Sequence, residues 1–108
     1  MTFVSVINNW FDVEWGGSIV LPDGWFGRPY DNQHTLTSSE ESEGKMLLVL
    51  DDNLRLTFSG LANVKIEGRN LVLGPFDNLI FEAISYGGGT LESKEYAGGV
   101  VKIISAPG

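Results

Sequence analysis

The sequence of 108 residues contains no cysteine, which excludes disulfide bonds, thiolate metal ligands and cysteine nucleophiles. It contains a single histidine, His34, so a metal site would depend almost entirely on carboxylates. Several carboxylates occur as adjacent pairs, such as Glu40 with Glu41, and consecutive residues of a strand point to opposite faces. The sequence therefore predicts neither a bound metal nor another cofactor.

Signals for export and for membrane insertion are also missing. No lysine or arginine precedes Arg28, and polar residues and glycines interrupt the apolar residues before it. We therefore expect neither a signal peptide nor a membrane span. No Asn-x-Ser/Thr glycosylation sequon occurs, and the lack of cysteine suits a reducing compartment. These absences predict a cytoplasmic protein.

Motifs for nucleotide binding and for serine catalysis are absent as well. The glycine run at residues 87–89 lacks the Gly-x-x-x-x-Gly-Lys-Ser/Thr spacing of a phosphate-binding loop. Glu92 stands where a dinucleotide-binding motif would need its third glycine. The Gly-x-Ser-x-Gly elbow of serine hydrolases does not occur. We interpret the glycine run as a turn.

The net charge is −7, and most of it belongs to the first part of the chain. Residues 1–44 contain seven acidic residues and one basic residue, which is a net charge of −6. An acidic surface repels nucleic acid and anionic lipid and attracts basic proteins. We therefore expect no binding to nucleic acid or membranes, and a basic protein or a small ligand as the partner. The alternative is that the charge only keeps the protein soluble.

The sequence contains several short segments in which apolar and polar residues alternate. Leu54–Ser59 places two leucines and Phe58 on one face and polar side chains on the other, which is the period of a half-buried strand. Residues 78–86 alternate in the same way, and turns rich in Asn, Asp and Gly separate such segments. The sequence predicts a single all-β domain over residues 1–108. We expect an antiparallel sandwich or barrel-like meander of about eight or nine short strands, with at most one short helical turn.

The N-terminal residues are interpreted as part of the same sheet structure. Residues 2–7 and 10–15 are predicted to form a hairpin, with its tight turn at Asn8 and Asn9 because asparagine tolerates a positive φ. In the second arm, alternation places Trp10 on the more solvated face. This interpretation leaves no helix at the N-terminus.

The later strands differ in how much of them we expect to be buried. Leu36–Ser42 is polar and is predicted to be an edge strand, whereas Lys45–Leu50 is almost continuously apolar and is predicted to be central and covered on both faces. For residues 91–97 we favour a strand or an irregular conformation over a helical turn. The predicted common core consists of Leu48, Leu54, Leu56, Phe58, Ile66 and Phe81.

Regular strands do not explain residues 21–34, LPDGWFGRPYDNQH. Two prolines and two glycines in this run exclude a helix and a central strand, so the sequence predicts a structured loop. The loop is also rich in aromatic rings and charges and contains the only histidine. We therefore predict a binding site for a ligand or partner at Asp23, Trp25, Phe26, Arg28, Tyr30, Asn32 and His34.

Three roles for this loop remain open. Catalysis would use His34 as a general base oriented by Asp31, with Arg28 holding an anion. Binding would use the aromatic rings, and a sugar would stack on Trp25 or Tyr30. The structural alternative is that the rings close the open end of a sheet. We favour a non-enzymatic binding domain, with a small acid/base enzyme and a sugar-binding module as the alternatives.

The run LPDGWFGRPYDN at residues 21–32 resembles one found in a group of short bacterial proteins of uncharacterised function, in which a β-rich half follows it. The resemblance covers 12 of the 108 residues. It implies a bacterial relative with a β-rich fold, and it transfers no activity, cofactor or site residue.

Overall fold

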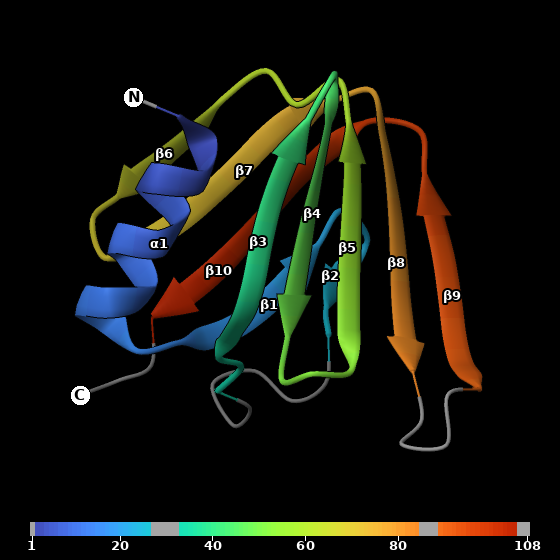
Figure 1. Cartoon of the computed structure of the whole chain (residues 1–108), viewed down its shortest axis with the longest axis horizontal. Coiled ribbons are helices and arrows are strands. Elements are labelled where there is room, and N and C mark those ends of the chain that lie inside the picture. Colours follow the sequence, from blue (N-terminus) through green and yellow to red (C-terminus); the bar gives the residue numbers. More distant parts are fainter. Residues whose placement is uncertain (1, 27–32, 85–88, 106–108) are drawn as a thin grey trace.

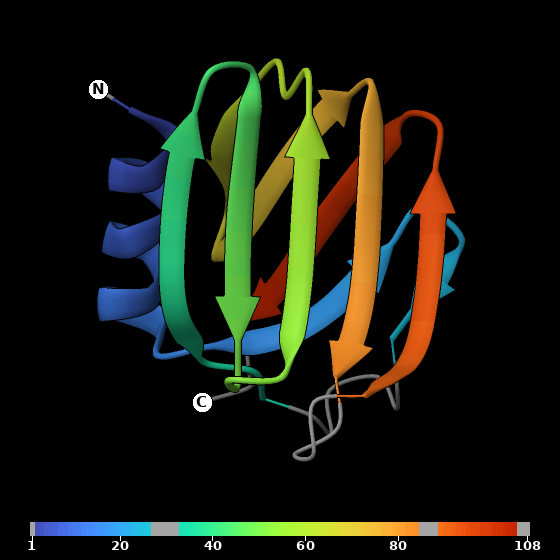
Figure 2. The same ribbon diagram turned by 45° about the vertical axis from the view of Figure 1, so that its right-hand side comes forward.

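The computed structural model describes residues 2–26, 33–84 and 89–105. In this part of the chain, two antiparallel sheets pack face to face and helix α1 (Phe3–Glu14) lies at one side of them (Figure 1, Figure 2). The first sheet has the order β2-β1-β10-β7-β6, with bounds Gly24–Trp25, Gly17–Leu21, Gly99–Ser105, Asn70–Phe76 and Val64–Glu67. The second has the order β3-β4-β5-β8-β9, with bounds Leu36–Ser42, Lys45–Leu50, Leu54–Ser59, Asn78–Ile84 and Thr90–Tyr96. The predicted all-β sandwich is confirmed.

The chain crosses repeatedly between the two sheets. Strands β3, β4 and β5 form a meander in the second sheet, β6 and β7 pair in the first, and β8 and β9 return to the second. The simple meander expected from the sequence therefore holds only for β3 to β5. One consequence is that β1 and β10, from opposite ends of the chain, are neighbours in which Ile19 faces Ile103.

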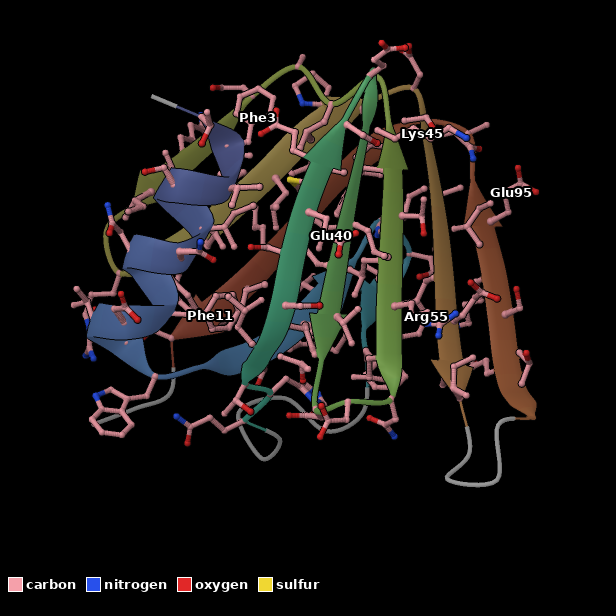
Figure 3. All side chains as sticks on the ribbon, viewed as in Figure 1. Phe3, Phe11, Glu40, Lys45, Arg55 and Glu95 are labelled. Atoms are coloured by element: carbon pink, nitrogen blue, oxygen red, sulfur yellow. The ribbon has the colours of Figure 1, made fainter. Side chains whose placement is uncertain are left out.

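The core lies where the alternating strands of the two sheets face each other. In β5, the register sets the buried ring of Phe58 opposite Met46 of β4 and Leu79 of β8. The side chain of Arg55 points away from the first sheet (Figure 3). The members of the predicted core that are buried are Leu48, Leu54, Leu56, Phe58 and Phe81.

Two expectations about burial are wrong. Ile66, predicted to lie in the core, is 49% exposed because it belongs to β6, an edge strand of the first sheet, where Val64 is buried instead. Strand β4 does lie between two neighbours, but it is not fully covered on both faces. Its residues Leu47 and Val49 are only half-buried because they face away from the first sheet.

The hairpin predicted for residues 2–15 is also wrong, because these residues form α1. The side chain of Thr2 caps the helix by accepting a hydrogen bond from the backbone N–H of Ser5. At the other end, Trp15 has a φ of 71° and donates its N–H to the carbonyl of Phe11. The helix has 12 residues, which is more than the single turn that the sequence led us to allow.

The same residues fit a helix when apolar positions three and four residues apart are compared instead of positions two apart. Ile7, Trp10 and Phe11 are buried, and their i, i+3 and i+4 spacing forms one apolar stripe. Trp10, expected on the solvated face, is 2% exposed. The stripe packs over the open side of the sandwich between β3 and β6 (Figure 2). Burial of that side selects the helix over the strand period.

The predictions for the edge strand β3 and for residues 91–97 agree better with the structure. β3 lies at an edge of the second sheet, as expected, and residues 90–96 form β9. β8 ends at Ile84, and residues 85–88, which include most of the predicted glycine turn, lie outside the described part of the chain. None of the helices in the described ranges is long and apolar enough to cross a membrane.

Candidate functional site

The candidate site is built around His34, which two sets of contacts hold in place. Its backbone N–H donates to the carbonyl of Gly17 at 2.8 Å, and its carbonyl accepts from the N–H of Gly17 at 3.1 Å. Its side-chain Nδ1 atom lies 2.5 Å from Oδ2 of Asp51. Because an ionised carboxylate only accepts hydrogen bonds, Nδ1 is the donor. These contacts fix His34 between the start of β1 and the turn that joins β4 to β5.

The carboxylate of Asp51 is itself oriented by the residue after His34. Its Oδ1 atom accepts from the backbone N–H of Thr35 at 2.9 Å and from its hydroxyl at 3.3 Å. The backbone N–H of Asp51 in turn donates to the carbonyl of Thr35. Asp51 and Asp52 have φ values of 55° and 64°, which is the left-handed conformation of a tight turn. The turn thus presents one carboxylate to the imidazole.

The second nitrogen of His34 has a different environment. Nε2 is buried and has no hydrogen-bond partner among the residues that the structure describes. The residue as a whole is 8% exposed. A general base must exchange a proton with a substrate, and here one ring nitrogen is occupied by Asp51 while the other is closed off from solvent. The geometry therefore favours a packed histidine over a catalytic one.

Phe26 forms the wall beside His34. Its backbone N–H donates to the carbonyl of Ile19, and its ring centroid lies 5.7 Å from that of His34 and 4.9 Å from that of Phe81. The contact with Phe81 is edge-to-face, the arrangement that aromatic rings prefer. Phe26 thus joins the predicted loop to the core, as expected for a ring that closes the open end of a sheet.

Phe26, His34 and Asp51 line a cleft of about 490 Å³. Other lining residues, Ala83 and Glu92, place it near the end of β8 and the start of β9, two strands that Figure 1 shows side by side. Ligand sites in proteins usually have volumes of roughly 300–1,000 Å³ and mostly apolar walls with a few polar groups. The cleft has this character. Its described lining residues are Phe26, His34, Asp51, Asn53, Leu54, Ala83 and Glu92.

The charge of the cleft is acidic. Asp51 and Glu92 contribute carboxylates, and no lysine or arginine occurs among the described lining residues. Lys94, two residues along β9, pairs with Glu92 across 3.4 Å, but both side chains are partly exposed. Exposed pairs of this kind are worth little, so Glu92 remains accessible to another cation.

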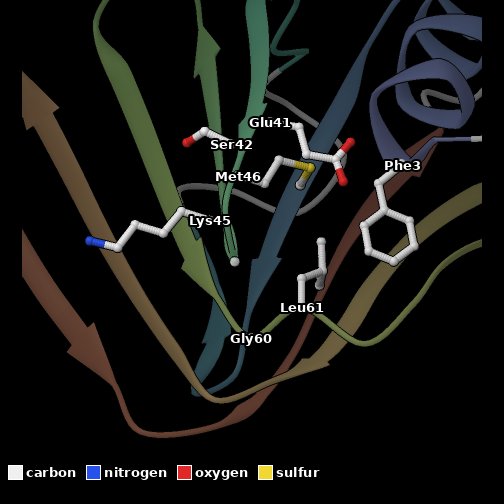
Figure 4. A pocket seen from close by; sticks show the side chains of 8 residues that line it. Phe3, Glu41, Ser42, Lys45, Met46, Gly60 and Leu61 are labelled. Carbon is white, nitrogen blue, oxygen red and sulfur yellow. The ribbon is translucent and has the colours of Figure 1, made fainter.

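A smaller hollow lies at the opposite end of the sandwich. It has a volume of about 100 Å³, and Figure 4 shows Phe3 close to Leu61 beside it, while the side chain of Lys45 extends away from them. This volume is below the usual range of ligand sites. The cleft beside His34 is therefore the stronger candidate.

The structure brings together only part of the predicted site. Phe26 and His34 line the cleft, whereas Asp23 and Trp25 do not. Trp25 is 38% exposed on β2, opposite Val20 of β1. The predicted residues Arg28, Tyr30, Asp31 and Asn32 lie outside the described part of the chain, so the roles proposed for them stay predictions.

Asp23 has a structural contact instead. Its Oδ1 atom accepts a hydrogen bond of 2.9 Å from the hydroxyl of Tyr96 and so joins the β1–β2 turn to β9 of the other sheet. Burial, and then this hydrogen bond to Asp23, raise the pKa of Tyr96 to about 12. The hydroxyl of Tyr96 therefore stays protonated, and able to donate to Asp23, at any physiological pH.

Sequence reasoning missed the cleft residues that lie outside the loop. By composition, Asp51 and Asn53 indicate only a turn between two strands, and Glu92 only breaks the spacing of a dinucleotide-binding motif. Asp51 is 17 positions from His34, and no local signal links the two residues. In residues 2–26, 33–84 and 89–105, no group of three histidine, aspartate or glutamate side chains is arranged to hold a metal ion.

Comparisons with known proteins found no matching family model, curated protein or solved structure for this chain. The resemblance of residues 21–32 to short bacterial proteins therefore stays a prediction.

Proposed function

We propose that this domain is a non-enzymatic binding module that accepts a positively charged group of a basic partner in the cleft beside His34. The observation that carries the proposal is the composition of the cleft. Phe26 and Leu54 form apolar walls of the cleft. The polar groups that line it are the carboxylates of Asp51 and Glu92 and the amide of Asn53. A lysine or arginine side chain has the matching chemistry, because its apolar stem can cover the walls while its charged end meets the carboxylates.

The charge of the whole chain supports a basic partner. The net charge of −7 would attract such a partner from a distance, and residues 1–44 carry most of the excess. Binding should then weaken as salt rises, because salt screens exposed charges. Within the cell we infer a cytoplasmic location, which the absence of cysteine supports.

Binding has more support than catalysis. An Asp-oriented histidine is the arrangement used in general acid/base enzymes, and His34 with Asp51 reproduces that pairing. The Nε2 atom, however, is buried and has no hydrogen-bond partner among the described residues, which supports a packed ring. A substrate screen tests the alternative: turnover that disappears in a folded His34→Gln variant would overturn the binding proposal.

The binding proposal is tested by NMR titration with short peptides as probes. We expect acetyl-Gly-Arg-Gly-amide to shift the backbone amide signals of Asn53, Leu54, Ala83 and Glu92, which line the cleft. The shifts should shrink as salt is added. The corresponding peptide with Glu in place of Arg should leave these signals unchanged, since like charges repel.

Two glutamates of β9 provide a matched pair of variants. Glu92→Gln removes a cleft carboxylate and should weaken the binding of the arginine peptide several-fold. Glu95→Gln removes the same charge from the outer face of the same strand, opposite Ile80, and should leave binding nearly unchanged (Figure 3). Equal losses in both variants would mean that the peptide only senses the overall charge, and the cleft would be rejected as the site.

A further inference from the structure

The register of the second sheet places the two carboxylates of the cleft at opposite ends of one row of residues. Leu50 of β4 pairs with Leu54 of β5, and Leu54 pairs with Ala83 of β8. Ala83 in turn pairs with Glu92 of β9, and Asp51 directly follows Leu50 at the other end. The row therefore crosses four strands that lie side by side (Figure 1). Neighbouring strands are about 4.8 Å apart, so the row is about 14 Å long between its backbone ends.

The middle of this row is apolar. Leu54 and Ala83 are buried on the face that the second sheet turns to the first, and both line the cleft. Side chains of paired residues lie on the same face of a sheet, so Glu92 lies on this face as well. Phe26 adds an aromatic wall beside the row. A ligand that extends from Asp51 to Glu92 must therefore cross an apolar surface, which suits methylene groups.

Each carboxylate can accept a cationic group of its own. Asp51 accepts from His34 and Thr35 through three donors, and a carboxylate offers about four acceptor positions. Its carboxylate is turned toward Thr35, which precedes β3, on the side of β4 that is opposite to β9. Glu92 pairs only with the partly exposed Lys94. One ammonium or guanidinium group therefore neutralises one end of the row and leaves the charge at the other end.

His34 contributes a further acceptor to the wall of the cleft. The residue lines the cleft and is 8% exposed, and its Nε2 atom has no hydrogen-bond partner among the described residues. Because Nδ1 donates to Asp51, Nε2 of the neutral ring can only accept. Buried polar atoms nearly always have a partner, and the matching partner here is a donor. An ammonium group is a donor without acceptor atoms, whereas an anionic ligand would offer acceptors to acceptors.

We propose that the ligand of the cleft is a linear aliphatic diamine, a methylene chain with an ammonium group at each end. One ammonium group meets Asp51 beside His34, the chain covers Leu54 and Ala83, and the second ammonium group meets Glu92. The inference rests on the proposed function, because the cleft must bind a cation, and adds that it binds two cationic groups at a set separation. Binding then depends on the length of the chain between them.

NMR titration of the full chain at neutral pH and constant ionic strength tests the inference. The probes are the linear diamines with three to eight carbons and the monoamines with the same chains, and the signals are the backbone amides of Leu54, Ala83 and Glu92. We expect the affinity of the diamines to pass through a maximum at one chain length. There it should exceed that of the matching monoamine at least about tenfold, because the second ammonium group adds a charge-assisted contact.

The two glutamates of β9 again separate the cleft from the overall charge. Glu92→Gln removes one end of the row and should lower the affinity of the best diamine to that of its monoamine. Glu95→Gln, on the outer face, should keep the full preference for the diamine. An equal loss of preference in both variants would overturn the inference, because the probes would then respond only to net charge.

The same titration distinguishes failure of this inference from failure of the proposed function. If monoamines or acetyl-Gly-Arg-Gly-amide shift the cleft signals as strongly as every diamine, the cleft binds one cationic group at a time. The inference is then overturned and the proposed function stands. If no amine and no arginine peptide shifts these signals, both are overturned.

Discussion

The Nδ1 atom of His34 lies 2.5 Å from Oδ2 of Asp51 and joins the end of the predicted loop to the β4–β5 turn. The Asp51 carboxylate also accepts hydrogen bonds from the N–H and the hydroxyl of Thr35, so it binds three hydrogen-bond donors in all. The same carboxylate lines the cleft. The contact therefore serves both the stability of this end of the sandwich and the shape of the proposed site.

Removing the carboxylate should destabilise the fold measurably. We expect Asp51→Ala to lower the free energy of unfolding by about 1–3 kcal/mol, because the donors of His34 and Thr35 lose their acceptor. Urea denaturation followed by circular dichroism measures the loss. Asp52→Ala is the matched control, since Asp52 shares the positive φ of the turn and its carboxylate has no hydrogen bond to His34 or Thr35. Equal losses in the two variants would show that only turn strain is being measured.

The core prediction concerns Phe58, whose ring is fully buried and meets Phe76 edge-to-face at 5.4 Å. Phe58→Ala should lower the free energy of unfolding by about 3–5 kcal/mol, since it removes a buried ring and leaves a cavity. The control is Ile80→Ala on the outer face of the neighbouring strand, for which we expect a loss below about 1 kcal/mol. A loss of that smaller size for Phe58→Ala in urea titration would contradict the assigned packing.

The pH prediction concerns Glu14. The hydrogen bond from the hydroxyl of Ser105, and then that from Arg69, hold the pKa of Glu14 below its ordinary value of 4.5. In the folded protein this carboxyl therefore takes up its proton at a lower pH than in the unfolded chain. The stabilisation is complete above the ordinary pKa and is lost as the pH falls through the lowered one.

The measurement compares the parent protein with Glu14→Gln in urea at about pH 7 and again at about pH 3. The difference in unfolding free energy between the two proteins should be larger at neutral pH and shrink in acid. Ser105→Ala removes the larger cause of the shift and should show the same trend. A difference that stays constant over this range would mean that the ionised carboxylate of Glu14 contributes nothing to stability.

Much of the fold follows from local patterns. The alternation of Leu54, Leu56 and Phe58 with polar residues predicts both the strand and the face that it buries, because side chains of a strand point to opposite sides in turn. The polar composition of β3 likewise predicts its position at an edge. Of the seven loop residues predicted to form the site, Phe26 and His34 line the cleft and Asp23 and Trp25 do not, while Arg28, Tyr30 and Asn32 lie outside the described residues.

Other features depend on what lies opposite in space. The sequence of α1 satisfies a strand period through Phe11 and Val13, and a helix period through Ile7, Trp10 and Phe11. The open side of the sandwich between the edge strands β3 and β6 favours the helix, because a helix with one apolar stripe can pack against both of these strands. The hydrogen-bond partner of the His34 side chain also depends on tertiary structure. Asp51 is brought to it by the pairing of β3 with β4, a contact between strands that no spacing along the chain reveals.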